Sequence, residues 1–134
     1  MIYLDTSALV KLAREELETP VLLDWLNAHS EDRVASKLVE LELPRALRRS
    51  GPAEALGAMT ALLSSLSRIE ISAAVRATAG AYTDPYLRTL DAIHLATADQ
   101  LRASGKTITA FVAYDKRLLA SAKAAGLPAI SPGS

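Results

Sequence analysis

The stretch Ile2-Tyr3-Leu4-Asp5-Thr6-Ser7-Ala8-Leu9 decides the fold of this chain. Its first three residues are apolar and strand-forming, with no turn signal among them, as a fully buried strand requires. An acid follows directly, and two hydroxyl residues suited to starting a helix come next. Ligands of open α/β sheets bind in the crevice at the carboxyl ends of the strands, so we expect Asp5 to point into such a crevice. The alternative is that Asp5 only caps the helix.

The composition favours one α/β domain. The chain has 134 residues, half of them hydrophobic and only 4% aromatic, so the core consists mainly of Leu, Ala, Val and Ile. Such a core suits helices packed on a buried sheet better than a β-barrel. We expect a single domain spanning residues 1–134, because this length supports one substantial core.

Charge and cysteine content narrow the class of protein. Basic and acidic residues number 15 each, so net charge does not steer the chain toward nucleic acid or membrane. The absence of cysteine excludes disulfides and thiolate metal sites and fits a reducing compartment. We find no signal peptide and no apolar run near the ~20 residues that span a bilayer. We therefore expect a cytoplasmic protein with no membrane association.

Strand and helix patterns alternate along the chain, which predicts parallel strands joined by right-handed crossovers. The fold class that follows is a three-layer α/β/α sandwich with a central, mostly parallel sheet of four or five short strands. We expect strands at 2–4, 33–35, 69–71, 107–113 and 129–130. We expect helices at 6–13, 20–28, 36–49, 53–66, 73–82, 90–103 and 115–125.

Acids recur where these strands end. Asp115 repeats the pattern of Asp5, an apolar strand followed by an acid and a helix, so both fall on one edge of a parallel sheet. Asp91 begins a helix that is apolar nearly all round, which implies deep burial, although an acid in a first helical turn is also favoured by the helix dipole.

A fourth acid comes from the helix at 36–49, as either Glu40 or Glu42. These residues lie two positions apart and point about 160° away from each other. The phase of the apolar residues puts Glu42 on the buried face and Glu40 on the polar face. A buried acid is costly without a compensating cation or hydrogen bonds, so we expect Glu42 to face the site.

Several carboxylates in one pocket repel each other and raise one another's pKa, and a divalent cation relieves this repulsion. Oxygen ligands without cysteine favour Mg²⁺, with Mn²⁺ also possible. Such a cation can activate water to attack a phosphodiester.

Other chemistries of an acid at a strand end fit this sequence less well. Position 7 is serine rather than the second acid of an aspartyl phosphatase, no glycine-rich phosphate loop is present, and Ser7 lacks a nucleophile elbow.

Four segments in order carry a resemblance to a known family. They are Tyr3-Leu4-Asp5-Thr6-Ser7-Ala8-Leu9, Glu42-Leu43-Pro44-Arg45-Ala46-Leu47-Arg48-Arg49, Leu90-Asp91-Ala92-Ile93-His94-Leu95-Ala96-Thr97-Ala98 and Tyr114-Asp115-Lys116-Arg117-Leu118. With these the chain resembles PIN-domain ribonucleases, specifically VapC-type toxins of type II toxin–antitoxin pairs, over essentially its whole length.

The resemblance implies a Mg²⁺-dependent endoribonuclease that cleaves RNA, is inhibited by a small antitoxin protein and forms a homodimer. It implies that Asp5, Glu42, Asp91 and Asp115 are the catalytic and metal-binding acids. Two alternatives stay open, a non-catalytic PIN-fold binding module and a PIN-fold DNA nuclease. Intact acids at all four positions argue against the first, and the short chain without insertions argues against the second.

Other residues have two interpretations each. His94 follows Asp91 by three positions and could face the pocket, but we favour a buried structural histidine. Lys116, Arg117 and Arg45 are candidate contacts for the RNA backbone, although they could equally be ordinary surface residues. The apolar residues Leu9, Val10 and Leu12 could form a groove for an antitoxin helix, with core packing as the default.

Overall fold

The computed structural model describes residues 1–134, apart from the side chain of Ser50. The described residues form five strands and seven helices. The strands are β1 (Ile2–Leu4), β2 (Arg33–Ser36), β3 (Ser67–Ile69), β4 (Ala110–Val112) and β5 (Ala129–Ile130). The helices are α1 (Thr6–Ala13), α2 (Thr19–Asn27), α3 (Val39–Ser50), α4 (Ala53–Ser64), α5 (Ala73–Ala81), α6 (Thr89–Ala103) and α7 (Lys116–Ala124).

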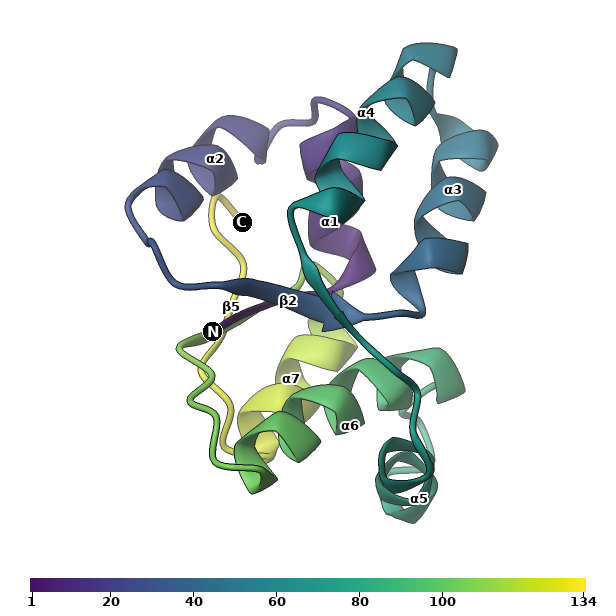
Figure 1. The fold of residues 1–134 in the computed structure, drawn as a ribbon, viewed down its shortest axis with the longest axis vertical. Coiled ribbons are helices and arrows are strands. Elements are labelled where there is room, and N and C mark those ends of the chain that lie inside the picture. Colours follow the sequence, from purple (N-terminus) through teal and green to yellow (C-terminus); the bar gives the residue numbers. More distant parts are fainter.

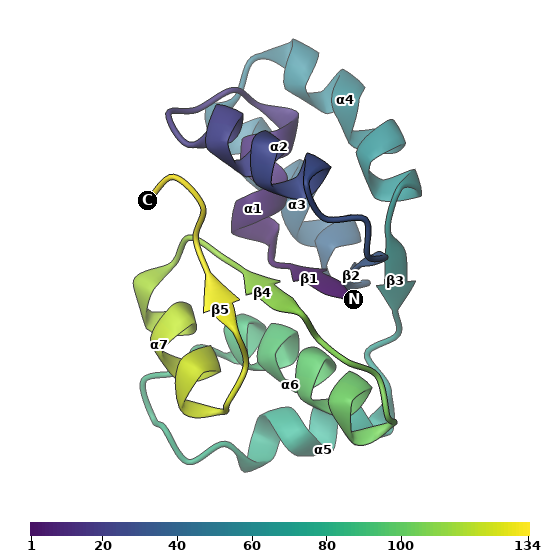
Figure 2. The same ribbon diagram turned by 90° about the vertical axis from the view of Figure 1, so that its left-hand side faces the viewer.

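All the strand pairs are parallel, in the order β3-β2-β1-β4-β5. Helices α1 to α4 lie on one side of the sheet and α5 to α7 on the other (Figures 1 and 2). The expected three-layer α/β/α sandwich with a parallel sheet is therefore confirmed. Among the described residues, no helix combines the length and the apolar character needed to cross a membrane.

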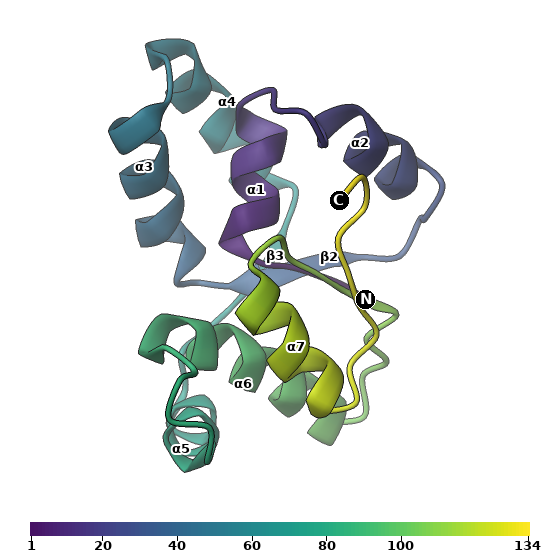
Figure 3. The ribbon, with the colours of Figure 1, turned by 180° about the vertical axis from the view of Figure 1, so that it is seen from behind.

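Strand β1 lies at the centre of the sheet and divides the core in two. Ile2 and Leu4 pack into the cluster beneath α1 to α4, whereas Tyr3 packs into the cluster beneath α6 and α7. This alternation follows from the two-residue period of a strand. Helix α5 lies outside α6 and packs against it (Figures 1 and 3).

Three elements differ most from the sequence prediction, and the other boundaries agree within two residues. Strand β3 covers Ser67–Ile69 rather than 69–71, because β2 pairs Val34 with Ser67 and Ser36 with Ile69. That pairing also keeps Ser36 in a strand, so α3 starts later than predicted. Strand β4 contains only Ala110–Val112 of the predicted 107–113. An exposed edge strand such as β3 has little hydrophobic signal, so pairing sets its limits.

Leu9 cannot line the suggested antitoxin groove on α1. Leu9 is fully buried in the core, and Val10 and Leu12 are partly buried against the same cluster. Core packing therefore accounts for Leu9, while a role of Val10 and Leu12 at the surface stays a prediction.

Candidate active site

The crevice lies where the connections from two adjacent strands diverge. Strands β1 and β4 are neighbours, and the chain continues from β1 into α1 on one face and from β4 into α7 on the other (Figure 2). Such a switch point opens a crevice beyond the carboxyl ends of the strands. Asp5 caps α1 and Asp115 caps α7, so both acids stand at this crevice, and both also cap helices.

Asp5 is held by the turn that follows it. Its Oδ2 atom accepts hydrogen bonds from the backbone N–H of Ser7 at 3.1 Å and from the Ser7 hydroxyl at 2.6 Å. The Ser7 oxygen in turn accepts from the backbone N–H of Tyr114 at 2.9 Å. Because Tyr114 directly precedes Asp115, Ser7 links the two turns that present these acids.

Glu42 reaches the same region from α3. Its Oε1 atom accepts from the Thr6 hydroxyl at 2.7 Å and lies 2.7 Å from Nε2 of His94. Glu40 instead lies on the exposed side, where Arg68 donates to it at 3.1 Å. Glu42 therefore faces the crevice and Glu40 faces solvent, as the phase of the apolar residues in this helix predicts.

His94 is 1% exposed and connects the core to the acids. Its Nε2 atom lies 3.4 Å from Oδ1 of Asp5, and its Nδ1 atom lies 2.7 Å from the hydroxyl of Tyr3. That hydroxyl also accepts from the backbone N–H of Ser36 at 3.2 Å. The predicted burial of His94 is correct, and its contacts with Asp5 and Glu42 give it a link to the acids that burial alone does not show.

Charge stabilises this arrangement. Burial lowers the pKa of His94, but the negative charges of Asp5, Glu42 and Asp91, together with the Glu42 hydrogen bond, raise it above its ordinary value. Burial raises the pKa of Glu42, but its hydrogen bond to His94, the His94 charge and the Thr6 hydroxyl hold it below its ordinary value. The two shifts agree in direction, because a charged His94 and an ionised Glu42 stabilise each other.

Asp91 lies one helical turn before His94 and is half-buried. Burial, followed by the charges of Asp5 and Asp115, raises the pKa of Asp91. These like-charge effects show that the acids from β1, α6 and β4 share one electrostatic environment.

The residues fit a hydrated divalent cation. In the part of the chain that the structure describes, no three acidic or histidine side chains already form a metal-binding cluster. Mg²⁺ retains several waters, so it needs few direct ligands. The oxygen donors and the raised pKa of Asp91 match the chemistry of this ion.

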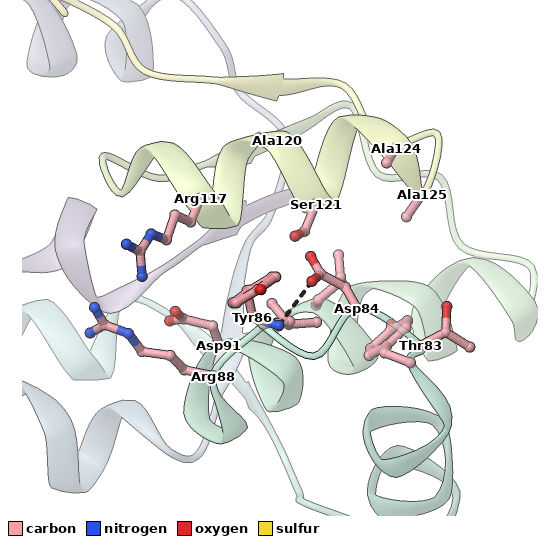
Figure 4. A pocket seen from close by; sticks show the side chains of 13 residues that line it. Thr83, Asp84, Tyr86, Arg88, Asp91, Arg117, Ala120, Ser121, Ala124 and Ala125 are labelled. Atoms are coloured by element: carbon pink, nitrogen blue, oxygen red, sulfur yellow. Dashed lines mark hydrogen bonds between the residues drawn. The ribbon is translucent and has the colours of Figure 1, made fainter.

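Two of the three basic residues proposed to contact the RNA backbone line cavities that also contain acids of the site. Arg117 lines a cavity of about 720 Å³ together with Asp91, and the two side chains lie at the same end of it (Figure 4). Arg45 lines a smaller cavity of about 350 Å³ with Thr6 and Glu42. Lys116 is exposed in the first turn of α7.

Sequence reasoning missed four residues of this site. Thr6 and Ser7 looked like helix-starting hydroxyls and Tyr3 like a core strand residue, yet all three bond within the network around the acids. Arg88, beside Asp91, was not considered. Only their position next to Asp5 and Asp91 could have indicated them.

The chain matches the PIN domain family over residues 2–125. It therefore belongs to the PIN-domain family. Its relatives include ribonuclease VapC35 of Mycobacterium tuberculosis H37Rv, 52% identical over 134 residues, covering 99% of this chain and 98% of that protein. Ribonuclease VapC47 of strain CDC 1551 is 41% identical over 137 residues, covering 100% and 98% respectively.

Solved structures share the fold. The crystal structure of Mycobacterium tuberculosis VapC20, a Sarcin-Ricin loop cleaving toxin, matches with a TM-score of 0.73 and 21% identity, covering 98% of this chain and 100% of that one. A toxin–antitoxin complex from Klebsiella pneumoniae matches with a TM-score of 0.72 and 20% identity, covering 98% of each chain.

Proposed function

We propose that this protein is a Mg²⁺-dependent endoribonuclease toxin that hydrolyses RNA phosphodiesters and is neutralised by a small antitoxin. The observation that carries the proposal is the convergence of acids from β1, α3, α6 and β4 at one crevice in a PIN-domain chain. The relatives named ribonuclease VapC support the same activity.

Asp5 and Asp91 would hold the cation directly, and Asp115 and Glu42 would complete its surroundings. Mn²⁺ could replace Mg²⁺ because both prefer oxygen ligands. A bound cation of this kind supplies an activated water and stabilises negative charge at the phosphate.

Side chains of the protein would hold the acids, the attacking water and the RNA in position. Thr6 and His94 both bond to Oε1 of Glu42, which fixes its carboxylate and leaves Oε2 to orient the attacking water. Ser7 fixes Asp5 in the same way. Preorganised polar groups of this kind do not have to reorient during the reaction. Lys116, Arg117 and Arg45 would hold the RNA backbone by charge.

The partners proposed for this chain are RNA, an antitoxin and a second copy of the chain in a homodimer, in the cytoplasm. Support for the antitoxin comes from the VapC relatives and from the fold shared with a chain of a toxin–antitoxin complex. Support for cytoplasmic location comes from the cysteine-free sequence.

Incubation with total cellular RNA tests the activity. We expect cleavage with Mg²⁺, loss of cleavage with a chelator, and recovery when Mg²⁺ or Mn²⁺ is returned. Single-stranded and duplex DNA are run in parallel. Preferential cleavage of DNA would favour the DNA nuclease, and RNA binding without cleavage under either cation would favour the non-catalytic module.

A further inference from the structure

The cavity of about 720 Å³ lies between the segment at 82–88 and helix α7, and Asp91 lines one end of it (Figure 4). Asp91 is the one of the four acids that lines it, so the cavity adjoins the candidate active site at that end. The remainder extends along α7 past Ser121 to Ala125. A ligand bound in this cavity would therefore lie beside the acids at which we propose that RNA is cleaved.

The walls of the cavity suit a flat, partly polar ring. Small apolar residues of α7, including Ala120 and Ala124, form one side, and Leu95 of α6 contributes to the lining. Tyr86 stands on the opposite side and is 80% exposed. Its backbone N–H donates to Oδ1 of Asp84 at 2.9 Å, which fixes the turn that carries it (Figure 4). Exposed aromatic rings next to basic residues are stacking platforms for unpaired bases.

Positive charge gathers where the cavity meets Asp91. The guanidinium groups of Arg88 and Arg117 both project toward the Asp91 end, from opposite sides of the cavity (Figure 4). Guanidinium groups bind phosphate oxygens through paired hydrogen bonds. The cavity thus has a part that can hold a ring and, at its Asp91 end, a part that can hold a phosphate. A nucleotide has the same two parts, a base and a phosphate, side by side.

We propose that this cavity binds an unpaired nucleobase of the RNA, adjacent to the phosphodiester that is cleaved, with Arg88 and Arg117 on the flanking phosphate. This inference rests on the proposed function and assigns a binding site for one base of its substrate. A base that stays stacked in an A-form duplex cannot enter the cavity, because it must first leave its stack.

Binding of RNA to catalytically disabled protein tests the proposal. In an Asp5→Asn background, Ala124→Trp fills the cavity and Tyr86→Ala removes the stacking ring. The controls Ala58→Trp and Leu17→Ala lie at exposed positions outside the cavity, on the α1 to α4 side. The probe is a short fluorescein-labelled oligoribonucleotide of mixed sequence, single-stranded or annealed into a duplex, and polarisation reports its Kd.

We expect each cavity variant to weaken single-strand binding about tenfold, as loss of one stacked base does, while the controls bind like their parent. The duplex should bind more weakly than the single strand. Equal affinity of the cavity variants and their parent would overturn the proposal, as would equal binding of duplex and single strand. The exposed Tyr86 position keeps the test valid even if Ala124→Trp does not fold.

Two further measurements separate this proposal from the others. If otherwise wild-type protein carrying Ala124→Trp cleaves RNA normally with Mg²⁺, the nucleobase site fails while the proposed function stands. If RNA binding depends on the cavity but no cation supports cleavage, the proposed function fails and the site stands. If the cavity variants convert a dimer into a monomer without changing RNA affinity, the cavity joins two copies and the proposal fails.

Discussion

Nε2 of His94 lies 2.7 Å from Oε1 of Glu42, across 52 positions of sequence, and joins helix α6 to helix α3. The same nitrogen is 3.4 Å from Oδ1 of Asp5, while the other ring nitrogen faces the buried hydroxyl of Tyr3. His94 therefore links two acids of the crevice to a hydroxyl group in the core. We assign it as a positioning residue, because it acts through the acids.

His94→Ala should lower kcat by about 10- to 100-fold, the usual effect of removing a group that orients metal ligands, with little change in KM. His94→Gln, whose amide can still donate to Glu42, should recover part of the loss. Steady-state cleavage of a labelled RNA gives both constants. A purely structural histidine would instead lower the melting temperature and leave kcat per folded molecule unchanged.

Asp5→Asn should abolish cleavage and leave the fold intact, and we expect the metal-free protein to be as stable as the wild type or more stable. Asparagine can still cap α1, whereas the substitution removes one of several clustered negative charges and a proposed metal ligand. RNA cleavage and thermal melting in chelator measure the two effects. Retained activity would rule out the proposed site.

Glu42→Gln should severely reduce cleavage, whereas Glu40→Gln should leave it nearly unchanged. Glu42 bonds to Thr6 and His94 within the crevice, while Glu40 pairs with Arg68 on the exposed side of α3. The two variants make the same chemical change on one helix, so each controls for the other. Cleavage rates are compared at equal concentrations of folded protein, and the opposite order would refute the assignment.

Asp91→Asn should raise the melting temperature of the metal-free protein at neutral pH. Burial and the charges of Asp5 and Asp115 raise the pKa of Asp91, so its proton is held more tightly in the folded state than in the unfolded state. This carboxyl therefore favours folding at acidic pH, and its contribution falls as pH rises through its unfolded and then its folded pKa.

The difference in melting temperature between Asp91→Asn and wild type should consequently shrink as the pH is lowered through the folded pKa of Asp91. Added Mg²⁺ should raise the melting temperature of the wild type more than that of the variant, because a ligand stabilises the state that binds it. A difference that does not vary with pH would contradict the shared electrostatic environment of the acids.

Expression of this protein alone should slow bacterial growth, and co-expression of a small protein encoded beside it should restore growth. Asp5→Asn serves as the matched inactive control and should not slow growth at the same expression level. Normal growth with confirmed expression of soluble wild-type protein would show that the toxin interpretation is wrong for that host.

The sequence determined the elements that local chemistry controls. The apolar run before Asp5 predicted a buried strand, and Asp115 repeated that pattern, so a parallel sheet with acids at one edge was expected. The phase of one helix was enough to place Glu42 toward the crevice and Glu40 toward solvent, because rotation about a helix axis depends on sequence spacing alone.

Only the tertiary structure decided which of these elements meet. The strand order β3-β2-β1-β4-β5 makes β1 and β4 neighbours, and this adjacency brings Asp5 and Asp115 to one crevice. The contacts of His94 depend on how α6 packs against β1 and α3, and burial alone does not specify which neighbours a residue has. The limits of β3 and the cavity beside Asp91 likewise arise from pairing and packing between segments distant in sequence, which no local pattern encodes.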